Sequence, residues 1–444
     1  MRKLISLILI VFIILFCSCS QMETKTETNI KNNTENNIEM TPQIFACEGR
    51  SIMLKSDGTV WTWGTNVSSK SNKNNENYNC MLGYETSSEF ESKPNKIQEL
   101  SDINKVVPTY YATYALKSDG SVWAWGLNDN GQLGDGTTDF RSSPVKVKAL
   151  SDIKDISAGN VSALALKNNG EVWTWGQNNT IPTIVEGIPK AKAIFKGGFY
   201  YLVLDESGTI WIWGSMFDTY VFNIKKIPKP IKIQGLTNIQ KVWASFGVVY
   251  VQKEDGTIWG FGNNFNELMN EKSIDEASDI SAVKIENLKN ISDIQTADSE
   301  LLNDFSLYSS IVTDDGIPML LGSWDFGLGQ KKTDTTPKWI PYQIKNLGKV
   351  KSTSISLSTC SFINQENKLF ILGNTFNTSV GRVGPEQPYE VKGIDKAKLV
   401  SSSLSHILVL KEDGTLWSWG NNEFGQLGDG TTKQNSNPVQ VIFP

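Results

Sequence analysis

One short pattern occurs eight times in this chain and restricts its fold more than any other feature. Each copy has an apolar stretch, a turn dipeptide such as Asp-Gly, a second apolar stretch and a closing glycine, as in LKSDGTVWTWG at 54–64. Asp-Gly supports the positive φ that a tight hairpin turn requires, so every copy predicts a β-hairpin. The copies lie at 54–64, 116–126, 166–176, 204–214, 252–262, 312–322, 363–373 and 410–420.

The spacing of the copies extends each hairpin to a four-stranded unit. The closing glycines recur every 38 to 62 residues, which leaves room for one strand before each hairpin and one after it, for example at 153–157 and 144–147. Both faces of the Trp-x-Trp strands are apolar and need cover, which radially stacked blades provide. We therefore predict an all-β, closed β-propeller of seven to eight four-stranded blades, with ten of the 14 tryptophans packed between blades. A β-solenoid is the competing architecture.

Two repeats continue beyond the hairpin in a distinctive way. They read WGLNDNGQLGDGTTDFRSSPVKV at 125–147 and WGNNEFGQLGDGTTKQNSNPVQV at 419–441, with degenerate versions at 81–83, 327–330 and 380–384. This pattern resembles the repeat of the regulator of chromosome condensation family over residues 42–444. The resemblance implies a propeller, typically of seven blades. Eight repeats predict eight blades unless the sixth or seventh repeat does not form a full one. Only His406 occupies the position, fourteen residues before the closing glycine, where the family often has histidine.

The amino-terminal residues predict export. Residues 1–19 (MRKLISLILIVFIILFCSC) begin with two cations, continue with an apolar run and end in small residues, as secretory signals do. Ser18-Cys19 resembles a bacterial lipobox, so we expect lipidation at Cys19 and an outward-facing, lipid-anchored protein at the bacterial cell membrane; an ordinary cleaved signal or an uncleaved anchor is the alternative. Residues 20–41 predict a disordered polar tether, and 42–444 the propeller domain. Cys47 and Cys80 either pair or, as we favour, are buried free thiols.

Composition argues against several kinds of function. A net charge of −5 does not suit a nucleic-acid groove, and a single histidine removes histidine-based metal clusters and most acid–base schemes. No nucleophile with a placed base is recognisable. Turn chemistry explains both GQLGDGTT and the aspartates of the hairpin turns better than phosphate or calcium binding does. We therefore expect no enzyme activity, no metal and no cofactor.

The remaining expectation is a surface-anchored interaction module. It would bind another protein, or a cell-wall component, through one face of the propeller. The alternatives are an extracellular glycan-acting enzyme that uses channel carboxylates and a structural surface component. Guanine nucleotide exchange, known from a eukaryotic relative, is not expected of an exported acidic protein. Expanded loops at 65–79 and 266–304 are either recognition loops or tolerated insertions. The candidate partner-binding rim residues are aromatic: Tyr110, Tyr111, Phe199, Tyr200, Phe246 and Tyr308.

Overall fold

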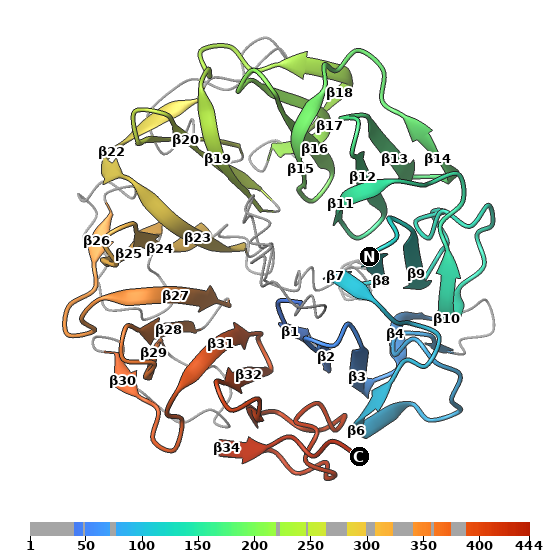
Figure 1. Ribbon diagram of the computed structural model, residues 1–444, viewed down its shortest axis with the longest axis vertical. Coiled ribbons are helices and arrows are strands. Elements are labelled where there is room, and N and C mark those ends of the chain that lie inside the picture. The colour runs from blue at the N-terminus through green and yellow to red at the C-terminus, as the bar shows by residue number, and fades with distance from the viewer. Residues whose placement is uncertain are drawn as a thin grey trace, which may run out of the picture.

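The computed structural model shows a ring of eight four-stranded antiparallel sheets (Figure 1). It describes residues 40–47, 49–71, 77–218, 223–245, 247–262, 282–298, 307–322, 341–356, 359–373 and 388–444. The predicted signal and Cys19, nearly all of the tether, Phe246 and the motifs at 327–330 and 380–384 lie outside these residues. Within the described part of the chain, no helix is long and apolar enough to cross a membrane.

Each sheet is one blade, and its four strands follow one another outward from the ring axis. Blades 1 and 2 contain β1 (Gln43–Cys47), β2 (Arg50–Leu54), β3 (Val60–Thr65) and β6 (Phe90–Lys96), then β7 (Ile103–Pro108), β8 (Ala112–Lys117), β9 (Val122–Gly126) and β10 (Arg141–Lys146). Blades 3 and 4 contain β11 (Ile153–Ala158), β12 (Ser162–Lys167), β13 (Val172–Gly176) and β14 (Asn179–Ile184), then β15 (Ala191–Lys196), β16 (Tyr200–Asp205), β17 (Ile210–Asp218) and β18 (Asn223–Lys232).

The second half of the ring follows the same order. Blades 5 and 6 contain β19 (Ile239–Ala244), β20 (Val248–Lys253), β21 (Thr257–Gly262) and β22 (Val283–Lys289), then β23 (Ile291–Asp298), β24 (Leu307–Thr313), β25 (Pro318–Gly322) and β26 (Tyr342–Gln343). Blades 7 and 8 contain β27 (Val350–Ile355), β28 (Cys360–Asn364), β29 (Leu369–Leu372) and β30 (Tyr389–Glu390), then β31 (Ala397–Ser402), β32 (His406–Lys411), β33 (Leu416–Gly420) and β34 (Asn435–Gln440).

The predicted fold class is confirmed, and the sixth and seventh repeats both form four-stranded blades. Two of the expected loops contain strands instead. The segment 65–79 contains the two-stranded sheet of β4 (Val67–Ser71) and β5 (Asn77–Asn79). The segment 266–304 includes all of β22 and β23, because the apolar residues of 283–298 complete blade 5 and begin blade 6.

The closing glycine of each hairpin is required by a close backbone approach. Gly64 lies opposite Arg50 in the β2–β3 ladder and has a φ of +96°. A Cβ at this position would lie 2.4 Å from Gly49 O, which no side chain can tolerate. The repetition of glycine in the sequence therefore reflects a repeated backbone contact, with the same crowding at Gly126, Gly176, Gly214, Gly262 and Gly420.

The hydrophobic core is divided among the junctions between blades. The second tryptophan of a pair lies deep in such a junction, and Trp63, Trp125 and Trp175 are at most 1% exposed. The first tryptophan, such as Trp61, is half-buried and packs against the same junction as Trp63. The ten tryptophans of the pattern therefore serve blade packing, as predicted.

The ring closes without a shared strand. Blade 1 consists only of strands from the beginning of the described chain and blade 8 only of strands from its end. Side chains join them instead: Ser51 Oγ lies 2.7 Å from His406 Nε2 and donates to Gln426 O at 2.9 Å. Phe443 packs edge-on against Trp61, with ring centroids 5.3 Å apart. Together with a hydrophobic cluster that includes Ile44, Trp63 and Leu408, these contacts join blade 8 to blade 1.

The cysteines differ in part from expectation. Cys80 and Cys360 are buried free thiols, whereas Cys47 is disulfide-bonded. The prediction of a free thiol is therefore confirmed for Cys80 and wrong for Cys47, and these two residues do not pair with each other. Cys80 lies in the segment between β5 and β6, packed with Met81, Tyr111 and Leu127, in a different hydrophobic cluster from Cys47.

Candidate interaction face

The two ends of the blades present different kinds of connection. Because neighbouring strands are antiparallel, the turns between the first and second strands and the loops between the third and fourth strands share one end of the ring. We call this end the clasp face. The hairpin turns between the second and third strands lie at the other end, which we call the turn face. The described chain enters the ring at the turn face, where Met40 N donates to Ser56 O at 3.2 Å.

A repeated hydrogen-bond relay organises the turn face. In blade 1, Thr59 donates from its backbone N and from Oγ1 to Asp57 Oδ1, at 2.9 and 2.6 Å. Trp61 Nε1 in turn donates to Thr59 Oγ1 at 3.0 Å. The same relay joins Asp119, Ser121 and Trp123; Asp255, Thr257 and Trp259; and Asp413, Thr415 and Trp417.

The relay accounts for the presence of aspartate in the turns without a bound metal ion. The hydrogen bond from the Ser121 side chain lowers the pKa of Asp119, and those from Thr257 and Thr415 lower the pKa of Asp255 and Asp413. Over the described ranges of the chain, no three His, Cys, Asp or Glu side chains are grouped so that they could hold a metal ion. The aspartate oxygens serve the hairpins to which they belong.

The GQLGDGTT loops on the clasp face connect neighbouring blades. The carbonyl of Gln132, in the loop of blade 2, accepts hydrogen bonds from Tyr114 OH and from Trp175 Nε1 of blade 3, both at 2.8 Å. Farther along the loop, Gly136 N donates to Thr180 O on the outer strand of blade 3, at 2.9 Å. We call each such loop a clasp.

The clasp of blade 8 repeats this arrangement on blade 1. Gln426 O accepts from Trp63 Nε1 at 2.9 Å, and Gly430 N donates to Ser92 O at 2.9 Å. Gly428 must be glycine, because a Cβ there would lie 2.7 Å from Trp63 Nε1. The motif is therefore a blade-to-blade connector, which fits the expectation of turn chemistry rather than phosphate binding.

The structure places the predicted rim aromatics in different environments, some buried and some half-buried. Tyr111 and Tyr200 are only 5% and 2% exposed, and Tyr200 OH donates to Ser245 O of blade 5 at 2.5 Å. Their burial between blades corrects the prediction that both line an exposed rim. Tyr110 and Phe199 are half-buried in clasp-face turns, and the Tyr110 ring packs edge-on against Tyr111 with centroids 4.9 Å apart. Partner binding by Tyr110 and Phe199 stays a prediction.

The remaining two predicted rim aromatics are Tyr308 and Phe246. Tyr308 lies in β24, opposite Gly322, at the clasp-face end of blade 6. Phe246 lies outside the described residues, so partner binding by either one also stays a prediction.

A buried lysine holds the turn that carries Phe199. The Lys196 ammonium is fully buried and donates to Gly197 O and Gly198 O at 2.8 Å and to Tyr200 O at 3.2 Å. It also lies 4.5 Å from the centroid of the Tyr201 ring. Burial lowers the pKa of Lys196 to about 7. Sequence pattern does not predict this cage, because a lysine at the end of a strand is ordinarily solvated.

Two polar residues that lie fourteen residues before a closing glycine, where the family often has histidine, form buried hydrogen bonds to the neighbouring blade. His406 is 1% exposed and lies between blade 8 and Ser51 of blade 1, and burial lowers the pKa of His406 to about 3. The Arg50 guanidinium donates to Met81 O at 2.9 Å and to Thr109 O of blade 2 at 2.7 Å. Burial lowers the pKa of Arg50 to about 10. Both side chains are inaccessible to a partner.

Three phenylalanines are exposed on the clasp face. Phe424 lies in the clasp of blade 8, Phe90 begins the outer strand of blade 1, and Phe140 ends the clasp of blade 2; their exposure is 40%, 39% and 42%. The fold itself does not require them. Asn130 occupies the position of Phe424 in the other clasp and makes the same hydrogen bond, its N donating to the glutamine two residues later at 2.9 Å. Gln434 takes the place of Phe90 in blade 8.

The innermost strands carry few acidic side chains. Asp155, on blade 3, pairs with Lys105 of blade 2 at 2.7 Å. Asp293, on blade 6, contacts the amide of Gln295 at 3.1 Å. Blades 4 and 5 lie between these two carboxylates, so among the described side chains they do not form the close pair that glycoside hydrolysis uses.

These features define an eight-bladed β-propeller in which clasps join blade 2 to blade 3 and blade 8 to blade 1. The chain carries repeats of the regulator of chromosome condensation (RCC1) type: residues 119–166 and 413–444 match one family model of that description, and 153–180 and 397–426 match a second. A regulator of chromosome condensation from Xenopus laevis is 42% identical over 55 residues, which are 12% of this chain and 13% of that protein. The match thus spans a small part of the relative.

Similar solved structures support the same fold. The structure of Prp20p from Saccharomyces cerevisiae has a TM-score of 0.51 and 17% identity, covering 72% of this chain and 86% of that one. Human WBSCR16 has a TM-score of 0.53 and 16% identity, covering 87% of this chain and 94% of that one. A structure of Kap60 bound to yeast RCC1 (Prp20) matches with a TM-score of 0.52 and 16% identity, covering 72% and 83%. At these identities the likeness concerns the fold alone.

Proposed function

We propose that this protein is a propeller that binds another protein through its clasp face. The observation that carries the proposal is the exposure of Phe90, Phe140 and Phe424 on that face, at positions where an equivalent part of the chain has a polar residue. Exposed aromatic side chains that the fold does not require are typical of interaction surfaces. Cell-wall glycan is a second class of ligand that such aromatics can stack against.

The arrangement on blades 8 and 1 supports this choice. A Cβ at Gly49 would lie 3.3 Å from the Phe424 ring and 3.1 Å from Thr65 Cγ2, so these two side chains are neighbours. Thr65 pairs with Phe90 in the β3–β6 ladder, and paired residues project from the same side of a sheet. Phe424 and Phe90 therefore belong to one apolar surface.

The same proposal includes the anchor. If Cys19 carries a lipid, the protein is attached to the outer side of the bacterial membrane by the segment before Met40. That segment joins the ring at the turn face, as the hydrogen bond from Met40 to Ser56 requires. The clasp face is then the end that points away from the membrane. Yeast Prp20, which shares the fold, is bound by Kap60 and has binding properties to Gsp1p and histones, so a propeller of this kind can serve as a binding module.

The test is a binding measurement with matched variants. Immobilised full-length protein is incubated with surface and secreted proteins of the source cells, and saturable ligands are identified and titrated. A triple variant, F90Q/F140Q/F424N, replaces each phenylalanine with the polar residue type found at the equivalent position. We expect it to lose binding, while I442S on the turn face keeps it.

Three results would contradict the proposal. One is the absence of any saturable protein ligand, combined with turnover of a wall polymer, which would favour the glycan-acting enzyme. Another is self-association in sedimentation that accounts for all binding, which would favour a structural surface component. The third is equal binding by the triple variant and the wild type, which would place the ligand elsewhere on the ring.

A further inference from the structure

Each phenylalanine exposed on the clasp face directly follows an exposed carboxylate. The three pairs are Glu89-Phe90, Asp139-Phe140 and Glu423-Phe424. The repeat itself does not require an acid before the start of the fourth strand, because in blade 8 the chain reads Lys433-Gln434 at the place of Glu89-Phe90. Within the described part of the chain, the three carboxylates that precede the phenylalanines form no ion pair.

The segments that carry these pairs are strongly acidic. Residues 85–93, 129–141 and 423–433 together contain eight Asp and Glu but three Lys and Arg. One of the three cations is already paired, because Arg141 lies 2.6 Å from the carboxylate of Asp135. The net charge of these segments, −5, equals that of the whole chain. The negative charge of the protein is therefore concentrated around the exposed phenylalanines.

Aromatic rings on the turn face are covered by cations of the chain itself. Lys55 Nζ lies 4.2 Å from the centroid of the Trp61 ring, and Lys167 Nζ lies 4.8 Å from that of Trp173. The face of an aromatic ring attracts a cation electrostatically. Among the described residues, no lysine or arginine lies over Phe90 or Phe424. These two rings are therefore open to a cation that another molecule brings.

The clasp of blade 8 brings rings and carboxylates to one place. A Cβ at Gly425 would lie 2.5 Å from Ser92 Cα, so the turn that carries Glu423 and Phe424 rests directly on β6, two residues from Phe90. A cation bound here can lie over a ring and pair with a carboxylate at the same time.

The clasp of blade 2 makes the same backbone contact without this chemistry. A Cβ at Gly131 would lie 2.9 Å from Thr180 Cα of blade 3. At this junction Asn130 takes the place of Phe424, and Asn178 and Asn179 take the places of Phe90 and Glu91. The clasp therefore requires neither the rings nor the carboxylate of the strand, and their presence at the junction of blades 8 and 1 needs another explanation.

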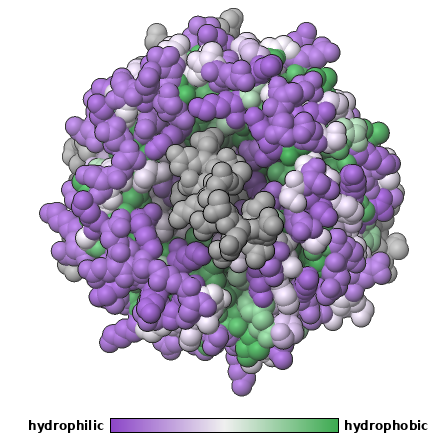
Figure 2. Space-filling model, in the orientation of Figure 1, coloured by the Kyte–Doolittle hydropathy of each residue, from purple (hydrophilic) through white to green (hydrophobic). Residues whose placement is uncertain are grey.

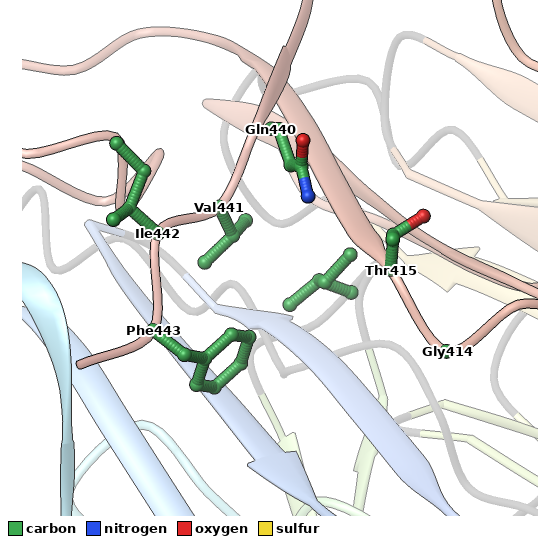
Figure 3. A pocket seen from close by; sticks show the side chains of 7 residues that line it. Gly414, Thr415, Gln440, Val441, Ile442 and Phe443 are labelled. Atoms are coloured by element: carbon green, nitrogen blue, oxygen red, sulfur yellow. The ribbon is translucent and has the colours of Figure 1, made fainter.

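Other parts of the surface lack this combination. The face of the ring drawn in Figure 2 is mostly hydrophilic, with small hydrophobic areas. A cavity of about 400 Å³ at the turn-face end of blade 8 is lined by Gly414, Thr415, Leu416 and residues 440–443 (Figure 3). The described residues around this cavity include no charged side chain, so it offers a cation no carboxylate.

We propose that the protein bound by the clasp face presents a basic segment, whose arginine or lysine side chains lie over Phe90 and Phe424 and pair with Glu89 and Glu423. Arginine suits this place best, because its planar guanidinium stacks on a ring while its N–H groups bind a carboxylate. The partner thereby supplies the cations that the chain itself supplies to its turn-face tryptophans. This inference rests on the proposed function and names the chemistry of the partner.

The test begins with a selection that presupposes no charge. A phage-displayed library of random peptides is selected on immobilised full-length protein, and peptides that also bind the F90Q/F424N variant are discarded. The remaining peptides need the two rings. We expect them to be enriched in arginine and lysine relative to the unselected library.

Two charge variants then locate the effect. The most enriched peptide is labelled with fluorescein and titrated in 0.1 M salt by fluorescence anisotropy. E89Q/D139N/E423Q should weaken binding about 10-fold, because each exposed ion pair contributes about two-fold. The control E186Q/E206Q/E254Q removes the same number of exposed carboxylates from the turn face. It should change the affinity by less than about two-fold, because a strand length of roughly 20 Å exceeds the screening distance of about 10 Å.

Three results would overturn this inference and leave the proposed function standing. They are ring-dependent peptides that are neutral or acidic, equal affinity of the wild type and E89Q/D139N/E423Q, and equal loss of affinity in the two charge variants. In each case the peptides still need Phe90 and Phe424. A selection that yields no ring-dependent peptide is a different result, because it contradicts protein binding by the clasp face and this inference together.

Discussion

The replacement Phe443→Ala tests how the ring closes. Phe443 packs edge-on against Trp61 and Trp63, with centroid distances of 5.3 and 6.3 Å, and Lys55 Nζ lies 3.9 Å from its ring centroid. No strand is shared between the first and last blades, so the loss of these contacts is not compensated by a backbone ladder. The substitution should therefore weaken this one junction selectively.

The expected magnitude follows from burial. Phenylalanine to alanine costs about 3–5 kcal/mol at a fully buried site. Phe443 is half-buried, so roughly half of that cost, about 2 kcal/mol, is the expected decrease in the free energy of unfolding. This figure includes the edge-on aromatic contacts, which contribute about 0.5–1.5 kcal/mol beyond burial.

Urea unfolding of F443A is compared with that of I442A, the neighbouring residue that is 49% exposed. The control should change stability by no more than about 0.5 kcal/mol. Hydrogen exchange then locates the change: amides of β1–β3 and β31–β33 should lose protection in F443A, while those of β19–β21 keep it. Equal effects of F443A and I442A, or a loss of protection spread evenly around the ring, would refute the closure argument.

Three further predictions concern single residues. Gly428→Ala should lower the free energy of unfolding in urea by more than Gly414→Ala does. Both glycines have a positive φ, +69° and +82°, which costs alanine about 1 kcal/mol, but only a Cβ at 428 would clash with Trp63 Nε1, at 2.7 Å. Equal losses of stability would contradict the clasp. Burial lowers the pKa of Lys196 from 10.5 to about 7, so between pH 7 and 10.5 the unfolded chain binds a proton that the folded chain does not. The free energy of unfolding should therefore rise with pH over this range, by up to about 1.4 kcal/mol per pH unit. The K196M variant should lose that slope in urea unfolding, and an unchanged slope would show that the ammonium is not caged. Burial likewise lowers the pKa of His406 from 6.5 to about 3, so stability should fall as pH decreases from 6.5 to 4.5, and H406N should lack this fall when unfolding is measured across that window.

The repeats made the fold predictable because each one is locally complete. The turn residues, the paired tryptophans and the closing glycine lie within eleven residues of one another, and local sequence can specify a hairpin. Even the weak copies at 312–322 and 363–373, which lack tryptophan, form β24–β25 and β28–β29 because their apolar patterning is intact. Eight copies therefore predicted eight blades.

The functional surface was less predictable, because exposure depends on neighbours far away in the chain. Tyr110 and Tyr111 are adjacent in sequence, yet one is half-buried and the other lies in the core. Tyr200 reads like a rim aromatic but bonds to Ser245 of the next blade. Phe424 is exposed, yet in the sequence it lies inside a motif shared with another repeat, which by itself predicts only a turn. The one sequence signal of its exposure is that Asn130 stands at the equivalent position in blade 2.

The sequence alone determined the repeating blade, its hairpins and its inter-blade tryptophans, because those depend on contacts within about fifty residues. Tertiary structure decided which donors the glutamine carbonyl of each clasp accepts from, which polar side chains are buried between blades, and how blade 8 meets blade 1. These contacts join residues such as Ser51 and His406, which are 355 positions apart. No local pattern encodes such a pairing: it exists only once the ring has closed.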